Sequence, residues 1–396
     1  MTRSIRIRRQ QGFSMVEALV SAALVLAVTA ASLALVDRAQ STFQVEPEAA
    51  DIQQRLRVAA GALSSDLLMA GAGSYSGSRT GPLTYYLAPV LPFRQGFRQS
   101  STAGTFRSDT ATLLYVPPTS AQTTTAQPVP EQSTDVIVTA SPGCPIGDAL
   151  CGFTGGMRAL VYDDDGAYSE YTITDTQAPL LQLQHDLHDA PRVFKPGSTI
   201  VQVATRTYYI KNDPATSSYQ LMRYDGGNSN DVPVVDHVVA LQFDYYGEPQ
   251  PPLMRQPLDA TSGPWTTYGP KPPPPGAQTT AYPPGENCVF TTNGTMMPAP
   301  RLPQLAGGSA LVRLTPGQLT DGPRCPDTVD PNRFDADLLR IRKIAVMLRV
   351  ESAVDALRGP AGVLFTHAGT SRSGNRFVPD AEVRFDVSPR NLNLGR

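Results

Sequence analysis

One stretch near the N-terminus limits what this chain can fold into. From Ala18 to Val36 the sequence reads ALVSAALVLAVTAASLALV, nineteen residues without a charged side chain. At about 1.5 Å per helical residue, a run of roughly 20 apolar residues crosses the hydrocarbon core of a bilayer. The run therefore predicts a membrane-spanning helix, which divides a short N-terminal segment from a body of 360 residues.

The charges around this run predict its orientation. Arg3, Arg6, Arg8 and Arg9 precede it, and no acidic residue comes before Glu17. Because basic residues beside a span stay in the cytoplasm, Met1 should be cytoplasmic and the body extracytoplasmic. The sequence thus predicts a single-pass protein of the cytoplasmic membrane with its C-terminus outside.

Beyond the span, apolar residues recur at steps of three and four, which indicates a helix with one face packed on the body. These positions are Val45, Ala49, Ile52, Leu56, Ala59, Leu63 and Leu67. One helix from about Ser14 to Met69 is predicted. Pro47 lacks a backbone donor, which predicts a kink or break near residues 43 to 47. The glycines at 70 to 77 should end the helix.

The body has the composition of many short strands joined by turns. Of the 396 residues, 37 are proline and 32 glycine, and only 17% are charged. The fold class predicted is α+β, a long N-terminal helix packed on an antiparallel β-rich head with loop insertions. The candidate strands are 110–116, 135–140, 159–162, 168–174, 180–184, 199–210, 219–224, 234–245, 341–351 and 382–387. Alternation in the last two predicts one buried face, with Ile344, Val346, Leu348 and Val350 in one strand and Val383, Phe385 and Val387 in the other.

Two stretches are interpreted as loops. Residues 117–134 are rich in Thr, Pro, Gln and Ser, and residues 247–308 contain the run PKPPPPG. So many prolines do not fit a sheet ladder, and polyproline segments are extended and solvated. The second stretch is either a disordered loop without a function or a contact surface.

Four cysteines fall into two local pairs, Cys144 with Cys151 and Cys288 with Cys325. Neither pair has the spacing of a zinc or redox motif, and an even number outside the cytoplasm favours disulfides. Three connectivities are possible, and the nearest-neighbour pairing is preferred because short loops close readily. Four buried free thiols are the alternative if the membrane prediction fails.

No residue set points to catalysis, a metal or a cofactor. The sequence has no Walker loop, G-x-S-x-G elbow or H-E-x-x-H helix, so no enzyme is predicted. In HDLHDA, a strand would point His185 and His188 to opposite sides, which favours a surface turn. DDDG at 163–166 fits a β-turn better than a calcium loop, and lone His237 and His367 are interpreted as structural. The net charge of −2 gives no basic field for nucleic acid.

The N-terminal segment QGFSMVEALVSAALVLAV closely resembles the type IV prepilin signal. The resemblance implies that a prepilin peptidase cuts between Gly12 and Phe13 on the cytoplasmic side, with N-methylation of Phe13. It also implies that Glu17 meets the positive N-terminus of a neighbouring subunit and sets the register of assembly. A carboxylate that reaches the membrane interface is the simpler alternative for Glu17.

Further blocks resemble the PilW family of minor pilins, related in part to the J-type pseudopilins of type II secretion. They are DIQQRLRVAAGALSSDLLMAGAG at 51–73, several strands between 205 and 247, LLRIRKIAVMLRV, and the terminal VRFDVSPRNL. The resemblance implies a leader peptide at 1–12, a transmembrane helix at 13–36, an amphipathic helix at 37–72 and a β-rich extracytoplasmic head at 73–396, with the proline-rich insertion at 247–308. Pro47 and this insertion depart from the family pattern.

The favoured hypothesis is a minor pilin that primes assembly of a type IV pilus, at or near its tip, and ends on the cell surface. Its implied partners are other minor and major pilins, the prepilin peptidase, the inner-membrane assembly platform and, as a further candidate, a tip adhesin. The alternatives are a J-type pseudopilin of a secretion system, and a membrane-tethered binding protein or adhesin whose proline-rich loop holds a partner.

Overall fold

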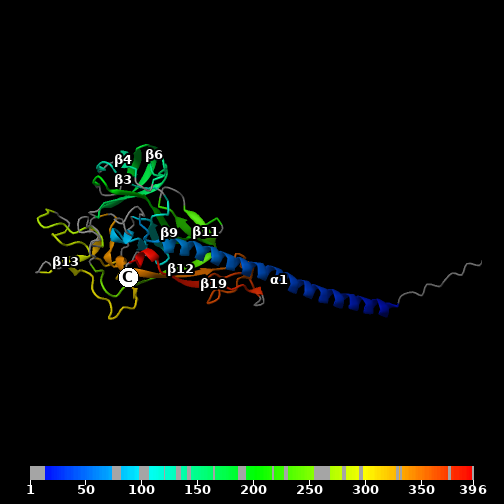
Figure 1. The fold of residues 1–396 in the computed structure, drawn as a ribbon. Helices are drawn as coiled ribbons and strands as arrows, with labels where there is room; N and C mark the ends of the chain where they lie inside the picture. Colours follow the sequence, from blue (N-terminus) through cyan, green and yellow to red (C-terminus); the bar gives the residue numbers. More distant parts are fainter. Residues whose placement is uncertain are drawn as a thin grey trace, which may run out of the picture. The chain divides into compact units, whose positions relative to one another are not determined.

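The computed structural model describes residues 14–73, 82–97, 107–119, 121–130, 135–140, 144–163, 166–185, 193–215, 218–226, 231–253, 268–278, 282–293, 298–326, 330, 332–372 and 376–394. Two compact units make up the chain, one of residues up to Gln53 with Ser352–Asp380, the other of Gln54–Glu351 with Ala381–Arg396. The architecture is α+β, as predicted, with an N-terminal apolar helix and a largely antiparallel β-rich body (Figure 1).

Helix α1 runs from Met15 to Met69 without interruption and contains Pro47. The predicted break is therefore wrong. A proline removes one backbone hydrogen bond, and a helix of 55 residues retains the bonds on both sides of it. Within the first unit, buried Glu48 gives further support, because its Oε1 accepts a hydrogen bond of 2.6 Å from the Ala353 backbone nitrogen. The helix ends as predicted, with Gly71 at φ 81° two residues beyond it.

The last part of α1 is fastened to a sheet of the second unit. Leu56, Ala59, Leu63 and Leu67 are buried. The Asp66 carboxylate accepts hydrogen bonds from the hydroxyls of Tyr115, at 2.8 Å, and Tyr208, at 2.6 Å. Burial, followed by the negative charge of Asp66, raises the pKa of Tyr115 to about 12 and raises the pKa of Tyr208 as well, so both hydroxyls stay hydrogen-bond donors. The helix is thus held by apolar packing and by one charged acceptor between two strands.

Those two strands belong to an antiparallel sheet of five. Its order is β1 (Val90–Pro92), β2 (Ala111–Tyr115), β9 (Ala204–Asp213), β10 (Ser218–Tyr224) and β11 (Val232–Asp236). A second sheet has the order β15 (Val312–Leu314), β12 (Val238–Gly247), β18 (Ile341–Val350) and β19 (Ala381–Val387). In β18 the predicted face of Ile344, Val346, Leu348 and Val350 is buried. Alternation therefore identified the inward face of this strand correctly.

Smaller elements complete the second unit. Two short hairpins pair β13 (Phe290–Thr292) with β14 (Pro298–Pro300), and β16 (Arg324–Cys325) with β17 (Phe334–Asp335). The 3₁₀ helices described in the chain are Leu83–Tyr85, Ala336–Arg340, Asp355–Leu357 and Arg390–Leu392. The turn expected at 335–339 is the second of these, and its N-cap Asp335 accepts from the Asp337 backbone nitrogen. The ladder of β14 corrects the expectation that the 247–308 insertion forms no strand; in a two-stranded ribbon, the missing donor of a proline need not face a neighbour.

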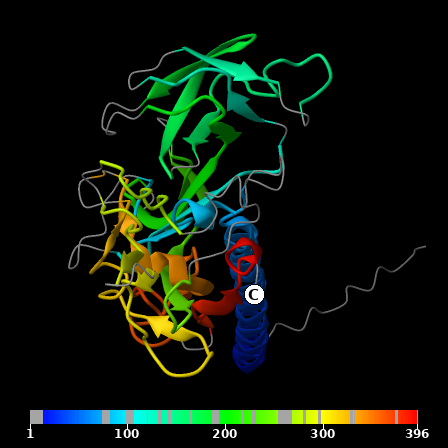
Figure 2. The same cartoon turned by 60° about the vertical axis from the view of Figure 1, so that its left-hand side comes forward.

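A closed barrel of six strands is inserted between β2 and β9. Its strands follow the order β3 (Gln122–Thr125), β4 (Asp135–Thr139), β7 (Leu180–His185), β6 (Tyr168–Gln177), β5 (Arg158–Tyr162) and β8 (Thr199–Gln202). Figure 2 shows these green and cyan strands grouped at one end of the second unit. The barrel encloses its own apolar core, with Val136, Ala159, Ile173, Leu181 and Ile200 among its members. Because β2 and β9 pair with each other, from Tyr115 opposite Ala204 onward, the barrel leaves and re-enters the sheet at one point.

Three sequence expectations are wrong, two at the barrel insertion and one at the junction between β11 and β12. The stretch 117–134, expected to be a loop, contains β3, because its β-branched threonines suit a strand. The single strand expected at 199–210 divides at Val203 into β8 in the barrel and β9 in the sheet. The strand expected at 234–245 divides at His237, whose φ of 55° turns the chain from β11 to β12. Hydropathy runs through both junctions unchanged, so the pattern did not reveal them.

Candidate functional site: an apolar helix and a disulfide-tethered loop

The first part of α1 presents an apolar surface on all sides. Met15–Val36 is long and apolar enough to cross a membrane, and its residues are exposed in the structure. At about 1.5 Å per residue its 22 residues extend about 33 Å, against a hydrocarbon core of about 30 Å. Inside this stretch the Thr29 hydroxyl donates to the Val25 carbonyl, so this hydroxyl is satisfied within the helix itself.

Glu17 has a role at the start of this helix that the sequence analysis missed. Its Oε2 accepts a hydrogen bond of 3.1 Å from the Ser14 backbone nitrogen, and Ser14 Oγ accepts one of 3.2 Å from the Val16 nitrogen. This is a capping-box arrangement. The side chain of the N-cap serine accepts from a backbone N–H of the first turn, and the glutamate three residues later accepts from the serine's own backbone N–H. The signal S-x-x-E was visible at Ser14–Glu17. A carboxylate has about four lone-pair sites, so the cap leaves acceptor capacity for a cation.

The predicted cleavage point, Gly12 and Phe13, lies outside the described residues. The helix cap begins at Ser14, one residue after Phe13. A chain that started at Phe13 would therefore carry its α-amino group within one residue of the capping box.

Two disulfides lie in the second unit, Cys144–Cys151 and Cys288–Cys325. They are the nearest-neighbour pairs, and they account for all four cysteines. The first closes a short loop of the barrel, in which Asp148 accepts hydrogen bonds from the backbone nitrogens of Leu150 and Gly152. The second ties the proline-rich insertion to β16. Both bridges fit an oxidising compartment.

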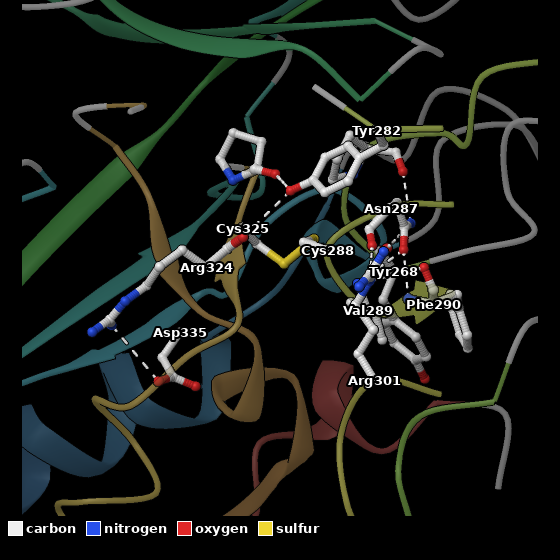
Figure 3. Close-up of a disulfide and its surroundings, with 12 residues drawn as sticks. Tyr268, Tyr282, Asn287, Cys288, Val289, Phe290, Arg301, Arg324, Cys325 and Asp335 are labelled. Carbon is white, nitrogen blue, oxygen red and sulfur yellow. Dashed lines mark hydrogen bonds and ion pairs between the residues drawn. A yellow bond between two sulfur atoms is a disulfide. The ribbon is translucent and has the colours of Figure 1, made fainter. Parts of the chain in front are cut away.

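The segment tied by Cys288–Cys325 forms a hydrogen-bonded framework around Asn287, which is fully buried (Figure 3). The Asn287 Nδ2 donates to the carbonyls of Tyr268 at 3.0 Å and Pro270 at 2.8 Å. Its Oδ1 accepts from the backbone nitrogens of Val289 and Phe290, both at 2.9 Å. One amide side chain thus joins the start of the insertion to the strand beside the disulfide.

Further contacts close this framework. Arg301 Nε donates to the Asn287 carbonyl at 2.8 Å, and its guanidinium pairs with Glu286. The Tyr282 hydroxyl donates to the Pro326 carbonyl, next to the disulfide (Figure 3). The described parts of the insertion are held by these contacts. We call this assembly, from Tyr268 to Pro326, the tethered loop.

Three aspartates come together at the end of the tethered loop. Ligand oxygens of Asp321, Asp335 and Asp337 lie within 4.8 Å of one another, and Asp335 and Asp337 are buried. Arginines pair with two of the three, since Arg340 Nε lies 2.5 Å from Asp337 Oδ1 and Arg324 Nη1 lies 3.7 Å from Asp335 Oδ2. Asp335 and Asp337 therefore belong to ion pairs within the protein. Its members are too scattered in the sequence to have been grouped beforehand.

The metal candidates of the sequence analysis gain no support. His185 ends β7, and the other residues of HDLHDA, 186–190, lie outside the described part. In DDDG, Asp163 and Gly166 frame the turn between β5 and β6, and Asp163 Oδ1 accepts from the Ala167 nitrogen at 3.0 Å. The Asp163 carboxylate therefore accepts a hydrogen bond within the turn, as expected for a β-turn.

No model of a known protein family matches the chain, and no curated protein matches it.

Removal of the Asn287 side chain should loosen the tethered loop. Asn287→Ala leaves two carbonyls and two backbone N–H groups without their partner, at about 1–3 kcal/mol for each group that stays buried. We expect the full chain in detergent to unfold at least about 2 kcal/mol more easily, and dithiothreitol to reduce Cys288–Cys325 faster. Asn212→Ala, on an exposed position of β9, is the matched control. Equal unfolding midpoints for Asn287→Ala and the parent would sink this assignment.

The aspartate cluster should make stability depend on pH. Burial raises the pKa of Asp335 from 3.8 to about 7, so the folded state favours the protonated carboxyl. This stabilising contribution is fully present below pH 3.8 and is lost as the pH rises through about 7. Between these values the parent should lose stability relative to Asp335→Asn, measured as denaturation midpoints at a series of pH values. Asp175→Asn, at an exposed position, should show no such trend. A difference between Asp335→Asn and parent that stays constant with pH would refute the shift.

Proposed function

We propose that this chain is a minor pilin of the PilW type, inserted in the cytoplasmic membrane by α1 and then built into a type IV pilus. The observation that carries the proposal is the exposed apolar helix Met15–Val36, which begins at a capped serine, holds a glutamate in its first turn and continues without interruption into a helix fastened to a β-rich body. A signal sequence removed after the apolar run would not need this continuity.

The proposed assembly is driven by the apolar faces of this helix. In the bilayer, lipid tails surround them. When a subunit leaves the bilayer, the same side chains would meet the helices of sister subunits, because nothing else removes them from water. The β-rich body would then act as the pilin-like head on the outside of the filament.

Glu17 would set the register of the assembled helices. After cleavage between Gly12 and Phe13, the new α-amino group is positive, and a carboxylate of a neighbouring subunit attracts it strongly in an apolar surrounding. The capping box fixes the Glu17 side chain at the helix start, so its position along the bundle is defined. Capping within one subunit and pairing with the next are compatible, because the carboxylate accepts from several directions.

The proposed function also implies a membrane topology and a set of partners. The four leading arginines favour a cytoplasmic N-terminus and an extracytoplasmic head, where the two disulfides would form. The partners proposed are other minor and major pilins, the prepilin peptidase, the inner-membrane assembly platform and a tip adhesin. Strands β11 and β19, which end the order of their sheets, offer edges for contacts between heads.

Two rival functions use the same helix differently. A J-type pseudopilin would place the chain in a type II secretion system and needs the same cleavage and the same role of Glu17. A membrane-tethered binding protein would use α1 only as an anchor, and the tethered loop is the observation that favours it. The anchor hypothesis gives Glu17 no role in filament assembly.

Substitutions of Glu17 separate a charge effect from a capping effect. Glu17→Gln keeps an oxygen that can accept from the Ser14 nitrogen but removes the charge, whereas Glu17→Ala removes both. If the charge sets the register, both variants should insert in the membrane at parental levels and reduce pilus number at least about tenfold, equivalent to about 1.4 kcal/mol. Pili are counted by electron microscopy, with membrane fractions blotted in parallel.

Val20→Ala, on the same helix, is the matched control and should leave pilus number near that of the parent. Restored piliation in Glu17→Gln would assign Glu17 to capping alone. Normal piliation in both variants, at parental protein levels, would reject the role of Glu17 in setting the register.

A further inference from the structure

The proline run at the start of the tethered loop has its conformation fixed by its own covalent structure. Each residue from Lys271 to Pro274 precedes a proline, which keeps it out of the helical region, and each proline holds φ near about −65°. These restrictions predict a polyproline II helix, with three residues per turn. A turn ends it, in which the Ala277 nitrogen donates to the Pro274 carbonyl at 3.1 Å.

One edge of this helix is attached to the protein. With three residues per turn, Pro270 and Pro273 have the same orientation. The Pro270 carbonyl accepts from Asn287 Nδ2 at 2.8 Å, and the Pro273 carbonyl accepts from the Gly285 nitrogen at 2.9 Å. Gly166, in the turn between β5 and β6, packs so closely on the Pro270 backbone that a Cβ there would overlap it. The edge at 270 and 273 is thus held by two segments of the same unit.

The other two edges consist of Lys271 with Pro274 and Pro272 with Pro275. Lys271, Pro274 and Pro275 are exposed, and Pro272 is half-buried. The two edges together form a ridge of proline rings with a basic residue at its start, which we call the proline ridge, Lys271–Pro275. A polyproline ligand engages its receptor by two edges and leaves the third edge unused, and here the unused edge is the attached one.

We propose that the proline ridge is a preformed ligand for an aromatic-lined polyproline-binding groove on a partner protein, with an acidic residue of that groove facing Lys271. Aromatic side chains pack on proline rings, and the run donates no backbone N–H groups from residues 272–275 that a groove would have to satisfy. The commitment to an acidic groove follows from charge complementarity with Lys271.

The contacts around the ridge reduce the conformational entropy that the run would lose when it binds a partner. Asn287 holds its first turn, and Cys288, the next residue, is covalently joined to Cys325. Gly269 lies against this bridge, since a Cβ there would be 2.9 Å from Cys288 Sγ. A ligand already held in its bound shape loses less freedom on association than a flexible one. This inference concerns the second unit alone, so it stands whether α1 enters a filament or only anchors the chain.

Binding is tested with the full chain in detergent micelles and an isotope-labelled SH3 domain, selected because it binds a synthetic peptide of residues 270–277. The proposal predicts that the full chain shifts the NMR signals of the aromatic groove in the SH3 domain and saturates them. Pro272→Ala/Pro275→Ala and Lys271→Glu should each weaken binding at least about tenfold, and Lys271→Arg should retain it. Pro360→Ala, at an exposed proline outside the run, is the control.

An intact Cys288–Cys325 bridge on a non-reducing gel and a parental melting temperature establish that each variant is folded. If the peptide binds the domain and the full chain does not, the ridge is covered and the proposal is wrong. Equal affinity of the parent and Pro272→Ala/Pro275→Ala would equally overturn it.

The native partner is tested in cells with a photo-crosslinking residue in place of Pro274. The proposal predicts that mass spectrometry locates the crosslink on a Trp, Tyr or Phe of another protein, with an acidic residue nearby in its groove. Crosslinks to lipid, or to another copy of this chain, would contradict a partner groove. Loss of piliation in Glu17→Gln together with an unchanged crosslink would separate this surface from the proposed filament role.

Discussion

The exclusion of one apolar helix from water is the constraint on which the rest of the molecule depends. Met15–Val36 leaves eleven large apolar side chains exposed. At about 1.5–3 kcal/mol each, covering them is worth roughly 17–33 kcal/mol. The net stability of a folded domain is only about 5–15 kcal/mol. Exposure of such a helix to water would cost more than the net stability of a folded domain, and the helix is long and apolar enough to cross a membrane.

In the second unit, polar contacts as well as apolar packing attach the last part of α1 to the five-stranded sheet. Asp66 joins α1 to β2 and β9 by two hydrogen bonds, and Leu63 and Leu67 pack on the same side of the helix. Truncating Leu63 or Leu67 would leave a cavity, and removing the tyrosine hydroxyls would leave the half-buried Asp66 carboxylate without two donors. The β-rich body of the second unit is therefore attached to the last part of α1.

Sequence patterns were informative where a feature is local. The length of the apolar run identified α1, alternation identified the inner face of β18, and Gly71 marked the helix end. They failed where distant segments decide the outcome. The barrel depends on β3 pairing with β8, some 75 residues later, and the strand at 199–210 changes sheet at Val203 without a change in hydropathy. The framework around Asn287 could not be predicted for the same reason. The local sequence NCVF, residues 287–290, does not indicate hydrogen bonds to Tyr268 and Pro270. The capping box at Ser14 and Glu17 is different, since its signal was local and was overlooked.

The most direct test of the central claim is the mass of the N-terminal peptide of the mature protein, isolated from membranes. A helix made for packing against its own kind should be freed of its basic leader yet keep its apolar run. The account predicts a chain that begins at Phe13 with one methyl group on its α-amino nitrogen, and a Gly12→Val variant that retains residues 1–12. A mature chain that still begins at Met1, or one that begins after Val36, would contradict it.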